Sequence, residues 1–267
     1  MERLDDKLIL SLGLDRDSVE YVFNSLRPTK KEVKLTQLDV LMALKPDSAM
    51  DYDLENGQLR FDGKPVFLRE TGEMEYPYGD TTFVAALVTA KCMEYSFKKT
   101  IKNARVIELG AGTGTLGLVS AALGAKEVIL TDLDVSIEQL KNNVELNMKS
   151  GWLKSGIVKV RELDWFSAED VANLGHFDFI LGSELWFDED LLAPLNQVLK
   201  TLTKINPNAV ILMGYQDRLL VDDTDISDAF SKCFHLERVK SDLMDPEFRV
   251  VSNKGLRIYR MGRRYRR

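Results

Sequence analysis

The sequence predicts an α/β fold organised around a doubly wound sheet. From about residue 105 onward, short apolar segments typical of buried strands alternate with longer segments of helical spacing. The first strand ends in a glycine-rich turn, and an acidic residue follows each of the next three strands. In doubly wound folds the carboxyl ends of the strands meet at an edge where ligands bind. We therefore expect a ligand site at that edge.

The composition fits one large domain preceded by an extension. The chain has 267 residues, of which 45% are hydrophobic and 29% charged, so it can bury a sizeable core. Residues 1–55 contain short stretches of helical apolar spacing, such as 8–14 and 19–26, which predict a mostly helical extension. Residues 56–267 form the expected main domain, with a core over about 80–262.

The sequence has no apolar stretch as long as a membrane-spanning helix, and its first residues lack the apolar run of a signal peptide. Cys92 and Cys233 lie far apart among apolar neighbours, which favours reduced, buried thiols over a disulfide. These features predict a cytoplasmic protein, with the nucleus as an alternative and no membrane contact.

The charge balance argues against a general nucleic-acid binder. The formal net charge is −6, whereas such proteins normally have a basic surface. The exception is the arginine-rich tail over residues 260–267, which could bind RNA or an acidic surface. A solvated chain end is the commoner interpretation of such a tail.

Before the main alternation of strands and helices, a β-hairpin is expected over residues 58–69. Asp62-Gly63 is a turn signal between two stretches in which apolar and polar residues alternate. A helix is expected over about 81–97, capped by Thr81 or the residue before it. Tyr78, just before this helix, either forms one wall of a ligand pocket or packs in the core.

The segment 105–117 predicts a buried strand, a glycine turn and the start of a helix. The helix should begin near Thr115 and end at Gly124, with its free N–H groups and partial positive charge directed at the turn. The turn contains three residues without a Cβ, so its backbone can lie directly against a ligand: Gly110, Gly112 and Gly114. We interpret this segment as a cofactor loop.

Two acidic residues indicate which cofactor this loop holds. The loop matches a dinucleotide pattern, but Glu108 would repel a pyrophosphate and suits a cationic ligand such as S-adenosylmethionine. The next strand, 127–132, ends in Asp132, 18 residues after Gly114, where an acid binds ribose hydroxyls in doubly wound folds. An ordinary βα turn and a nicotinamide cofactor are alternatives. The missing Gly-Lys-Ser/Thr ending excludes a nucleoside-triphosphate loop.

The third strand leads to residues suited to an adenine base. After a helix over about 134–148, with a capping box at Ser136 and Gln139, the strand 157–163 ends in Asp164-Trp165. The carboxylate can accept a hydrogen bond from the exocyclic amine, and the indole ring can lie against the base. Trp165 fits a core position equally well.

The fourth strand, 177–184, brings Glu184 to the same edge of the sheet. Gly182-Ser183 lacks the spacing of a nucleophile elbow, and only two histidines occur in the chain, so a serine triad or a histidine-rich metal site has little support. The remaining pattern predicts two helices, 190–203 and 225–233, and three strands, 209–215, 234–239 and 256–260.

Together these segments resemble the ordered motifs of the seven-β-strand S-adenosylmethionine-dependent methyltransferases. The resemblance implies a class I, Rossmann-like, seven-stranded sheet that is mostly parallel with a reversed last strand. More narrowly, the motifs are similar to those of protein-lysine methyltransferases that modify translation elongation factors, chaperones and ribosomal proteins. The resemblance covers about residues 58–260 and rests on Glu108–Gly114, Thr131-Asp132, Leu163–Trp165, Gly182–Phe187 and Tyr215–Arg218. That group's Asp-x-x-Tyr signature reads Glu184-x-x-Phe187 here, and Tyr78 stands where the group has a tryptophan.

The resemblance implies roles for the matching residues. Glu184, Trp186 and Phe187 would face the acceptor, and Glu184 would bind either the acceptor amine or the ammonium group of the cofactor. Glu108 and the glycines would hold the methionine part, Asp132 the ribose, and Asp164 with Trp165 the adenine. The full implied cofactor set is Tyr78, Glu108, Gly110, Ala111, Gly112, Gly114, Asp132, Leu133, Asp164, Trp165, Ser183 and Glu184, without a metal.

We therefore expect an S-adenosylmethionine-dependent methyltransferase that modifies a lysine of a translation factor, a ribosomal protein or a chaperone, and releases S-adenosylhomocysteine. Methylation of a small amine, or of protein histidine or arginine, is the alternative within enzymes. An alternative of another class is a scaffold that binds the cofactor with little catalysis.

Overall fold

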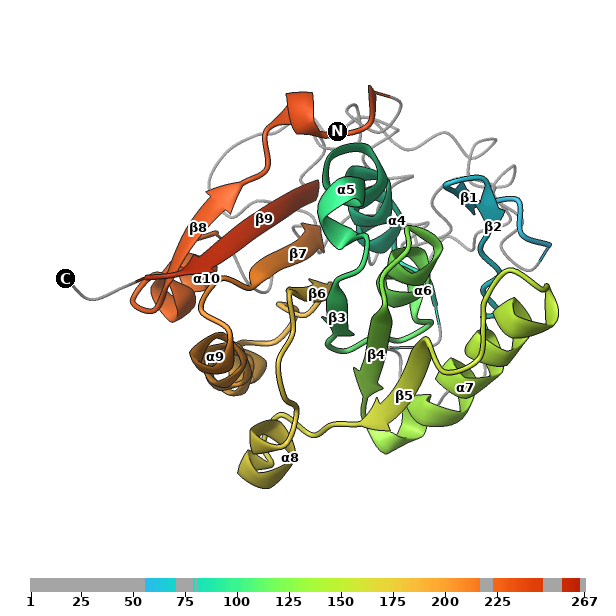
Figure 1. Cartoon of the computed structure of the whole chain (residues 1–267). Helices are drawn as coiled ribbons and strands as arrows, with labels where there is room; N and C mark the ends of the chain where they lie inside the picture. The colour runs from blue at the N-terminus through green and yellow to red at the C-terminus, as the bar shows by residue number, and fades with distance from the viewer. Residues whose placement is uncertain (1–55, 71–78, 80, 217–222, 247–255, 265–267) are drawn as a thin grey trace, which may run out of the picture. The chain divides into compact units, whose positions relative to one another are not determined.

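The computed structural model describes residues 56–70, 79, 81–216, 223–246 and 256–264. These residues all belong to one compact unit, Met50–Arg267 (Figure 1). The expectations for the N-terminal extension and for Tyr78 lie outside the described residues. Among the helices in these ranges, none is both long and apolar enough to cross a membrane.

A seven-stranded sheet forms the centre of this unit, with strand order β5-β4-β3-β6-β7-β9-β8 (Figure 1). The pairs from β5 to β7 are all parallel, and β9 runs antiparallel to both of its neighbours. The predicted doubly wound fold with a reversed last strand is therefore confirmed. The strands are β3 (Arg105–Glu108), β4 (Glu127–Asp132), β5 (Val158–Glu162), β6 (Phe179–Ser183), β7 (Val210–Gln216), β8 (Phe234–Arg238) and β9 (Leu256–Arg263).

The strand order places a switch point between β3 and β6. From β3 the chain continues outward to β4 and β5, and then crosses back to β6 on the other side of β3. The two halves of the sheet thus diverge at the ends of β3 and β6, which is where doubly wound folds bind their ligands. The glycine loop follows β3, and Glu184 follows β6.

Helices cover both faces of the sheet. Alternate residues of β3 belong to separate apolar clusters: Val106 packs with α4, α6 and the hairpin, whereas Ile107 packs with α9 and α10. The helices are α4 (Val84–Cys92), α5 (Lys98–Ile101), α6 (Thr115–Ala122), α7 (Asp134–Lys149), α8 (Ala168–Ala172), α9 (Glu189–Ile205) and α10 (Asp223–Phe230), with a π-helical turn η1 (Met93–Phe97) and a 3₁₀ turn η2 (Ser241–Leu243).

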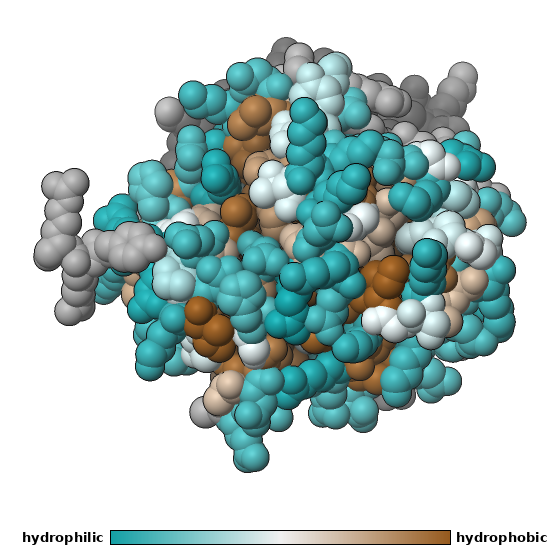
Figure 2. All heavy atoms as spheres, in the orientation of Figure 1, coloured by the Kyte–Doolittle hydropathy of each residue, from teal (hydrophilic) through white to brown (hydrophobic). Residues whose placement is uncertain are grey.

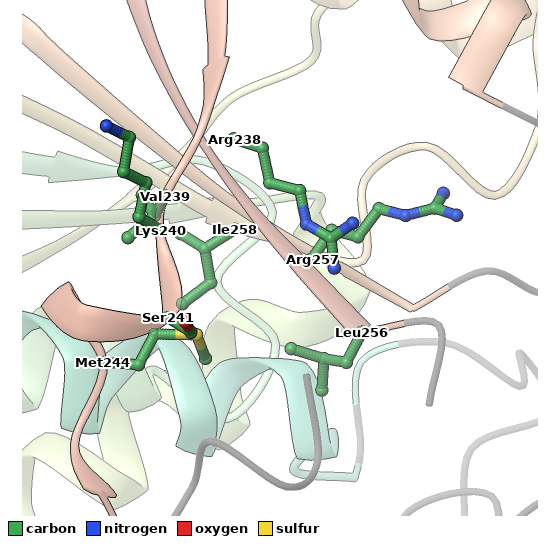
Figure 3. A pocket seen from close by; sticks show the side chains of 8 residues that line it. All are labelled: Arg238, Val239, Lys240, Ser241, Met244, Leu256, Arg257 and Ile258. Atoms are coloured by element: carbon green, nitrogen blue, oxygen red, sulfur yellow. The ribbon is translucent and has the colours of Figure 1, made fainter. Parts of the chain in front are cut away.

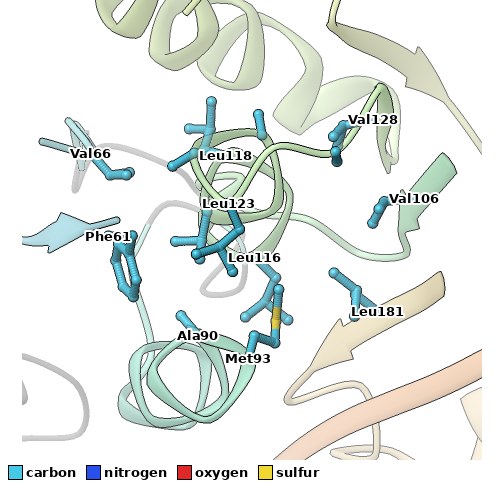
Figure 4. Close-up of a cluster of buried hydrophobic side chains, with 14 of the residues drawn as sticks. Phe61, Val66, Ala90, Met93, Val106, Leu116, Leu118, Leu123, Val128 and Leu181 are labelled. Atoms are coloured by element: carbon cyan, nitrogen blue, oxygen red, sulfur yellow. The ribbon is translucent and has the colours of Figure 1, made fainter. Parts of the chain in front are cut away.

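The predicted hairpin is present as β1 (Arg60–Phe61) and β2 (Lys64–Pro65), which pair antiparallel. Its turn residues, Asp62 and Gly63, have φ values of 49° and 75°, as a tight hairpin turn requires. Phe61 and Val66 are fully buried and point toward Leu116, Leu118 and Leu123 of the α6 region (Figure 4). The hairpin therefore closes the core over the helix that follows the glycine loop.

Some predicted details of helix starts and of the chain end are wrong. The helix expected from residue 81 begins at Val84, and its N-cap is Phe83, which makes no side-chain capping bond. The helix after Asp132 begins at Asp134 as predicted, but Ser136 lies inside it, so the predicted capping box is wrong. The arginine-rich tail is not all a free chain end, because β9 continues to Arg263. The short elements α8 and η2 had no sequence signal that we recognised.

Candidate functional site

The glycine loop turns where the sequence predicts. Gly110, Gly112 and Gly114 have φ values of 54°, 53° and 84°, a region that favours residues without a Cβ. The N–H of Ala111 donates to Thr131 O at 2.9 Å, which ties the loop to the end of β4. A Cβ on Gly112 would lie 3.2 Å from Gly79 O, so another backbone segment approaches the loop closely.

Glu108, at the end of β3, faces α6 instead of the edge of the sheet. Its Oε1 accepts the N–H of Leu116 at 3.1 Å, and its Oε2 accepts the N–H of Gly117 at 2.7 Å. These are free N–H groups of the first turn of α6, which carries a partial positive charge. Burial raises the pKa of Glu108 to about 8, against the lowering effect of the two N–H groups. In this structure Glu108 caps the helix that supports the loop.

We expect the pKa of Glu108 to make stability fall as pH rises. Below pH 4.5 the carboxyl is protonated in both the folded and the unfolded chain. Between pH 4.5 and about 8 only the folded chain keeps the proton, so each rise in pH favours the unfolded chain. The free energy of unfolding should therefore decrease by about 2 kcal/mol between pH 5.5 and 7 relative to the variant Glu108→Gln. Urea unfolding at both pH values measures this difference.

Glu127→Gln is the matched control for this measurement. Lys159 and Arg105 lower the pKa of Glu127, so this carboxylate contributes stability above pH 4.5 and loses it only toward acid. The free energy of unfolding of Glu127→Gln should therefore decrease between pH 5.5 and 7 by the same amount as that of the wild type. If the free energy of unfolding of the wild type and that of Glu108→Gln change equally between pH 5.5 and 7, Glu108 is not buried in its protonated state.

Asp132 holds the loop from the end of β4. Its Oδ2 accepts the N–H of Gly112 at 2.8 Å, and its Oδ1 accepts the N–H of Leu133 at 2.8 Å. Burial raises the pKa of the Asp132 carboxyl, against the lowering effect of those N–H groups. Each carboxylate oxygen has a second lone pair, so Asp132 can still accept bonds from ribose hydroxyls.

Two exposed apolar side chains follow the ends of β4 and β5. Leu133 is 51% exposed directly after Asp132, and Phe166 is 68% exposed directly after Trp165. The face of the molecule in Figure 2 is mainly hydrophilic, with hydrophobic residues in small separate patches. Exposed large apolar side chains at the ends of β4 and β5 are suited to contact a flat aromatic base.

Trp165 lies beside the glycine loop. A Cβ on Gly110 would be 3.5 Å from Trp165 Cζ2 and 2.6 Å from Leu185 Cδ2, so the ends of β5 and β6 both reach the first glycine. Asp164 Oδ1 accepts the N–H of Phe166 at 2.9 Å, which fixes the turn that presents the indole. The structure thus brings Trp165 to the loop, as the adenine role requires.

Glu184 occupies the switch point in a conformation that is rare for its residue type. Its φ is +57°, in the left-handed region, and its side chain is 7% exposed. The N–H of Glu184 donates to Gly214 O at 2.9 Å, and Glu184 Oε1 accepts the N–H of Gln216 at 3.0 Å. The carboxylate is therefore held across the ends of β6 and β7. Local strain of this kind is common at functional sites.

The other two residues expected at the acceptor lie in different surroundings. Trp186 is 1% exposed and packs against Tyr215, Phe230 and Tyr259, with ring centroids 5.8, 5.7 and 5.4 Å away. Its ring belongs to the core and presents no open face, so we do not include Trp186 in the proposed acceptor site. Phe187 is partly exposed and directly precedes Asp188, the N-cap of α9.

Sequence reasoning missed polar residues that position the loop from behind. Asn143 and Asn147 lie one turn apart on the buried side of α7. Asn147 bonds the backbone N–H and C=O of Phe67, and Asn143 does the same for Arg69 while also donating to Thr113 O at 3.0 Å. The sequence did contain an indication of this role, since Asn143 and Asn147 occupy positions at which the helical pattern predicts apolar residues.

A cavity of about 400 Å³ opens between the end of β8, η2 and the start of β9 (Figure 3). Leu256, which lines this cavity, pairs with Gln216 in the β7–β9 register, and Gln216 binds Glu184. The cavity therefore lies next to the candidate site, separated from Glu184 by β7. Its walls are formed by Arg238, Val239, Lys240, Ser241, Met244, Leu256, Arg257 and Ile258. None of them was a candidate from the sequence.

The donor set fits S-adenosylmethionine better than a phosphate-bearing cofactor. The turn is made by Gly110, Gly112 and Gly114, which have no Cβ, and the partly buried carboxylate of Asp132 lies beside it, which disfavours a pyrophosphate and suits ribose hydroxyls. Within the described residues, no three side chains of His, Cys, Asp or Glu are grouped so that they could hold a metal ion.

Comparison with known proteins gives a consistent family. A family model described as lysine methyltransferase matches residues 67–234, which include the loop, Asp132, Trp165 and Glu184. Protein N-lysine methyltransferase METTL21A of Danio rerio is 34% identical over 172 residues, covering 64% of this chain and 76% of that protein. EEF1A lysine methyltransferase 3 of Mus musculus is 32% identical over 142 residues, covering 53% and 58%. Among solved structures, a ribosomal protein L11 methylase from Lactobacillus delbrueckii subsp. bulgaricus has a TM-score of 0.47 at 19% identity, covering 72% of this chain and 90% of that chain.

Proposed function

The chain belongs to the lysine methyltransferase family, and we propose that it methylates a lysine side chain of a translation factor, a ribosomal protein or a chaperone. The observation that carries this proposal is the family match over residues 67–234, which spans the glycine loop, Asp132, Trp165 and Glu184. The name of one relative, EEF1A lysine methyltransferase 3, supports a translation factor as the first substrate to test.

Family membership makes this chain an S-adenosylmethionine-dependent methyltransferase, and the bound cofactor supplies an electrophilic methyl group on its sulfonium. The protein contributes mainly position. Asp132 would accept bonds from the ribose hydroxyls while it holds the Gly112 N–H, and Trp165 with Leu133 would enclose the base. Fixing both reactants in line can supply most of the rate enhancement of such a displacement.

A lysine acceptor must lose a proton before it can attack. With an ordinary pKa near 10.4, formation of the neutral amine at pH 7.4 costs roughly 4 kcal/mol. Burial disfavours the ammonium form and lowers this cost. Glu184, buried and held across β6 and β7, can accept an N–H bond from the amine and so orient its lone pair. The aromatic face of Phe187 is a second candidate for contact with the amine.

The proposal is tested with methyl-labelled S-adenosylmethionine, the purified protein and extract from cells that lack it. Protein, small-molecule and RNA fractions are counted separately, with Glu184→Ala as the inactive control. One discrete labelled protein that is absent with the control supports the proposal. Label only in small molecules would instead indicate a small-amine methyltransferase, and tight cofactor binding without label would indicate a scaffold.

We propose that this reaction takes place in the cytoplasm or nucleus. The two described cysteines are free thiols, which suits a reducing compartment. The net charge of −6 suits a protein partner better than nucleic acid. Fluorescence microscopy of the tagged full chain tests this placement, and retention in a secretory compartment would contradict it.

A further inference from the structure

Unpaired polar atoms gather beside Glu184. In the part of the chain that the structure describes, three buried oxygens without a hydrogen-bond partner belong to residues at the ends of β6 and β7 and on α4: Thr89 Oγ1, Ser183 Oγ and Gln216 Oε1. Buried polar atoms of proteins are nearly always paired, and each exception calls for an explanation. Three such atoms in one region of the candidate site, on α4 and at the ends of β6 and β7, point to a ligand.

Gly214 in β7 shows how close these atoms are. A Cβ on Gly214 would lie 2.3 Å from Thr89 Oγ1 and 3.2 Å from Ser183 Oγ, so both hydroxyl oxygens crowd the same side of this glycine. Ser183 is directly opposite Gly214 in the β6–β7 register. Gln216 is two residues further along β7, which places its side chain on the same face of the sheet.

The same stretch of β7 holds Glu184. Gly214 O accepts the N–H of Glu184, and the N–H of Gln216 donates to Glu184 Oε1. The face of the sheet that carries Ser183 and Gln216 is the one covered by α4, which supplies Thr89 (Figure 1). Four oxygen-bearing side chains from three elements therefore surround the ends of β6 and β7.

The chemistry of these groups selects the ligand. A carboxylate and an amide carbonyl only accept hydrogen bonds, and each hydroxyl can accept two. A complementary ligand must bring several N–H donors in a small volume, which describes a primary amine. When a neutral amine donates both N–H bonds to such acceptors, its lone pair is left to point elsewhere. That arrangement is required of a nucleophilic nitrogen.

We propose that Thr89, Ser183 and Gln216 form, together with Glu184, an amine-binding subsite at the ends of β6 and β7. This inference rests on the proposed function, which offers two amines, the ε-amine of the acceptor lysine and the α-amine of the cofactor. Thr89 is fully buried, so its unpaired hydroxyl destabilises the free protein. Destabilising groups of this kind are a known cost of functional sites.

The test separates a binding role from a packing defect. Thr89→Val and Gln216→Met keep the side-chain volume and remove one unpaired oxygen each, so thermal stability should be unchanged or higher. Thr203→Val is the matched control, because Thr203 is equally buried but its Oγ1 already donates to Leu199 O at 2.7 Å. The readouts are the melting temperature, the Kd of S-adenosylhomocysteine by calorimetry, and the KM of the labelled protein substrate.

We expect each subsite variant to raise one of the two constants at least fivefold, while the control changes neither. A higher KM with an unchanged Kd assigns the subsite to the acceptor lysine, and a higher Kd assigns it to the amine of the cofactor. Both constants within twofold of the wild type, or an equal change in Thr203→Val, would overturn the proposal. If the wild type methylates no protein, the proposed function fails, and the Kd alone decides the subsite.

Discussion

Replacing Glu184 by alanine is expected to lower the rate of methyl transfer at saturating substrates by roughly 100-fold or more, in line with the loss of one preorganised polar group from an active site. Glu184 is buried, strained in the left-handed region, and held across two strands by the N–H of Gln216. Its removal takes away the carboxylate that accepts the Gln216 N–H at the ends of β6 and β7. Single-turnover transfer of labelled methyl to the protein substrate measures the effect.

Two further variants make this result specific. Glu184→Gln keeps an oxygen that can accept the Gln216 N–H, so it separates the charge of the carboxylate from its structural bond. Glu162→Ala removes an exposed carboxylate from the end of β5 and should leave transfer unchanged. The account fails if Glu184→Ala keeps a third of the wild-type rate while folded.

The second large effect is expected on cofactor affinity. Asp132→Ala should raise the Kd of S-adenosylhomocysteine by roughly 30- to 100-fold, because each hydrogen bond to a charged group contributes about 1.5–3 kcal/mol. The variant removes the acceptor of the Gly112 N–H, and with it the group expected to bind the ribose hydroxyls. Isothermal titration calorimetry measures the Kd, and Asp134→Ala, an exposed carboxylate two residues away, is the control. A change below threefold in a folded Asp132→Ala protein would exclude Asp132 from the cofactor site.

The fold could be predicted from the sequence because its signals are local. The central strands β3, β4, β6 and β7 are short, mainly apolar runs with a glycine or an acidic residue at their end, and the helices α7 and α9 have an apolar face. The strand β4 has the predicted bounds, Glu127–Asp132, and the helix after the glycine loop begins at Thr115 as expected. The helix expected from residue 81 begins at Val84, and its N-cap Phe83 makes no side-chain bond, so the capping signal at Thr81 did not mark its start.

The roles of single residues were harder to predict, because they depend on contacts between distant segments. Trp186 follows a strand end, and this pattern suits a site residue and a core residue equally. Its surroundings are decided by Tyr259, a residue of the last strand. Glu108 precedes the glycines as a ligand-binding acid would, but its carboxyl group turns back to α6. Thr89 lay in no motif, and Gln216 lay in the segment Tyr215–Arg218 without an expected role, since only the folded chain places these residues near the end of β6.

The central claim is that this chain methylates lysine in a protein, and one measurement tests it most directly. The labelled substrate band from the extract assay is hydrolysed to amino acids, and the labelled product is compared with standards of methylated lysine, arginine and histidine. The account predicts that the label runs with methyl-lysine and disappears with Glu184→Ala. Label in methyl-arginine or methyl-histidine would contradict the claim, as would label that is lost from the protein before hydrolysis.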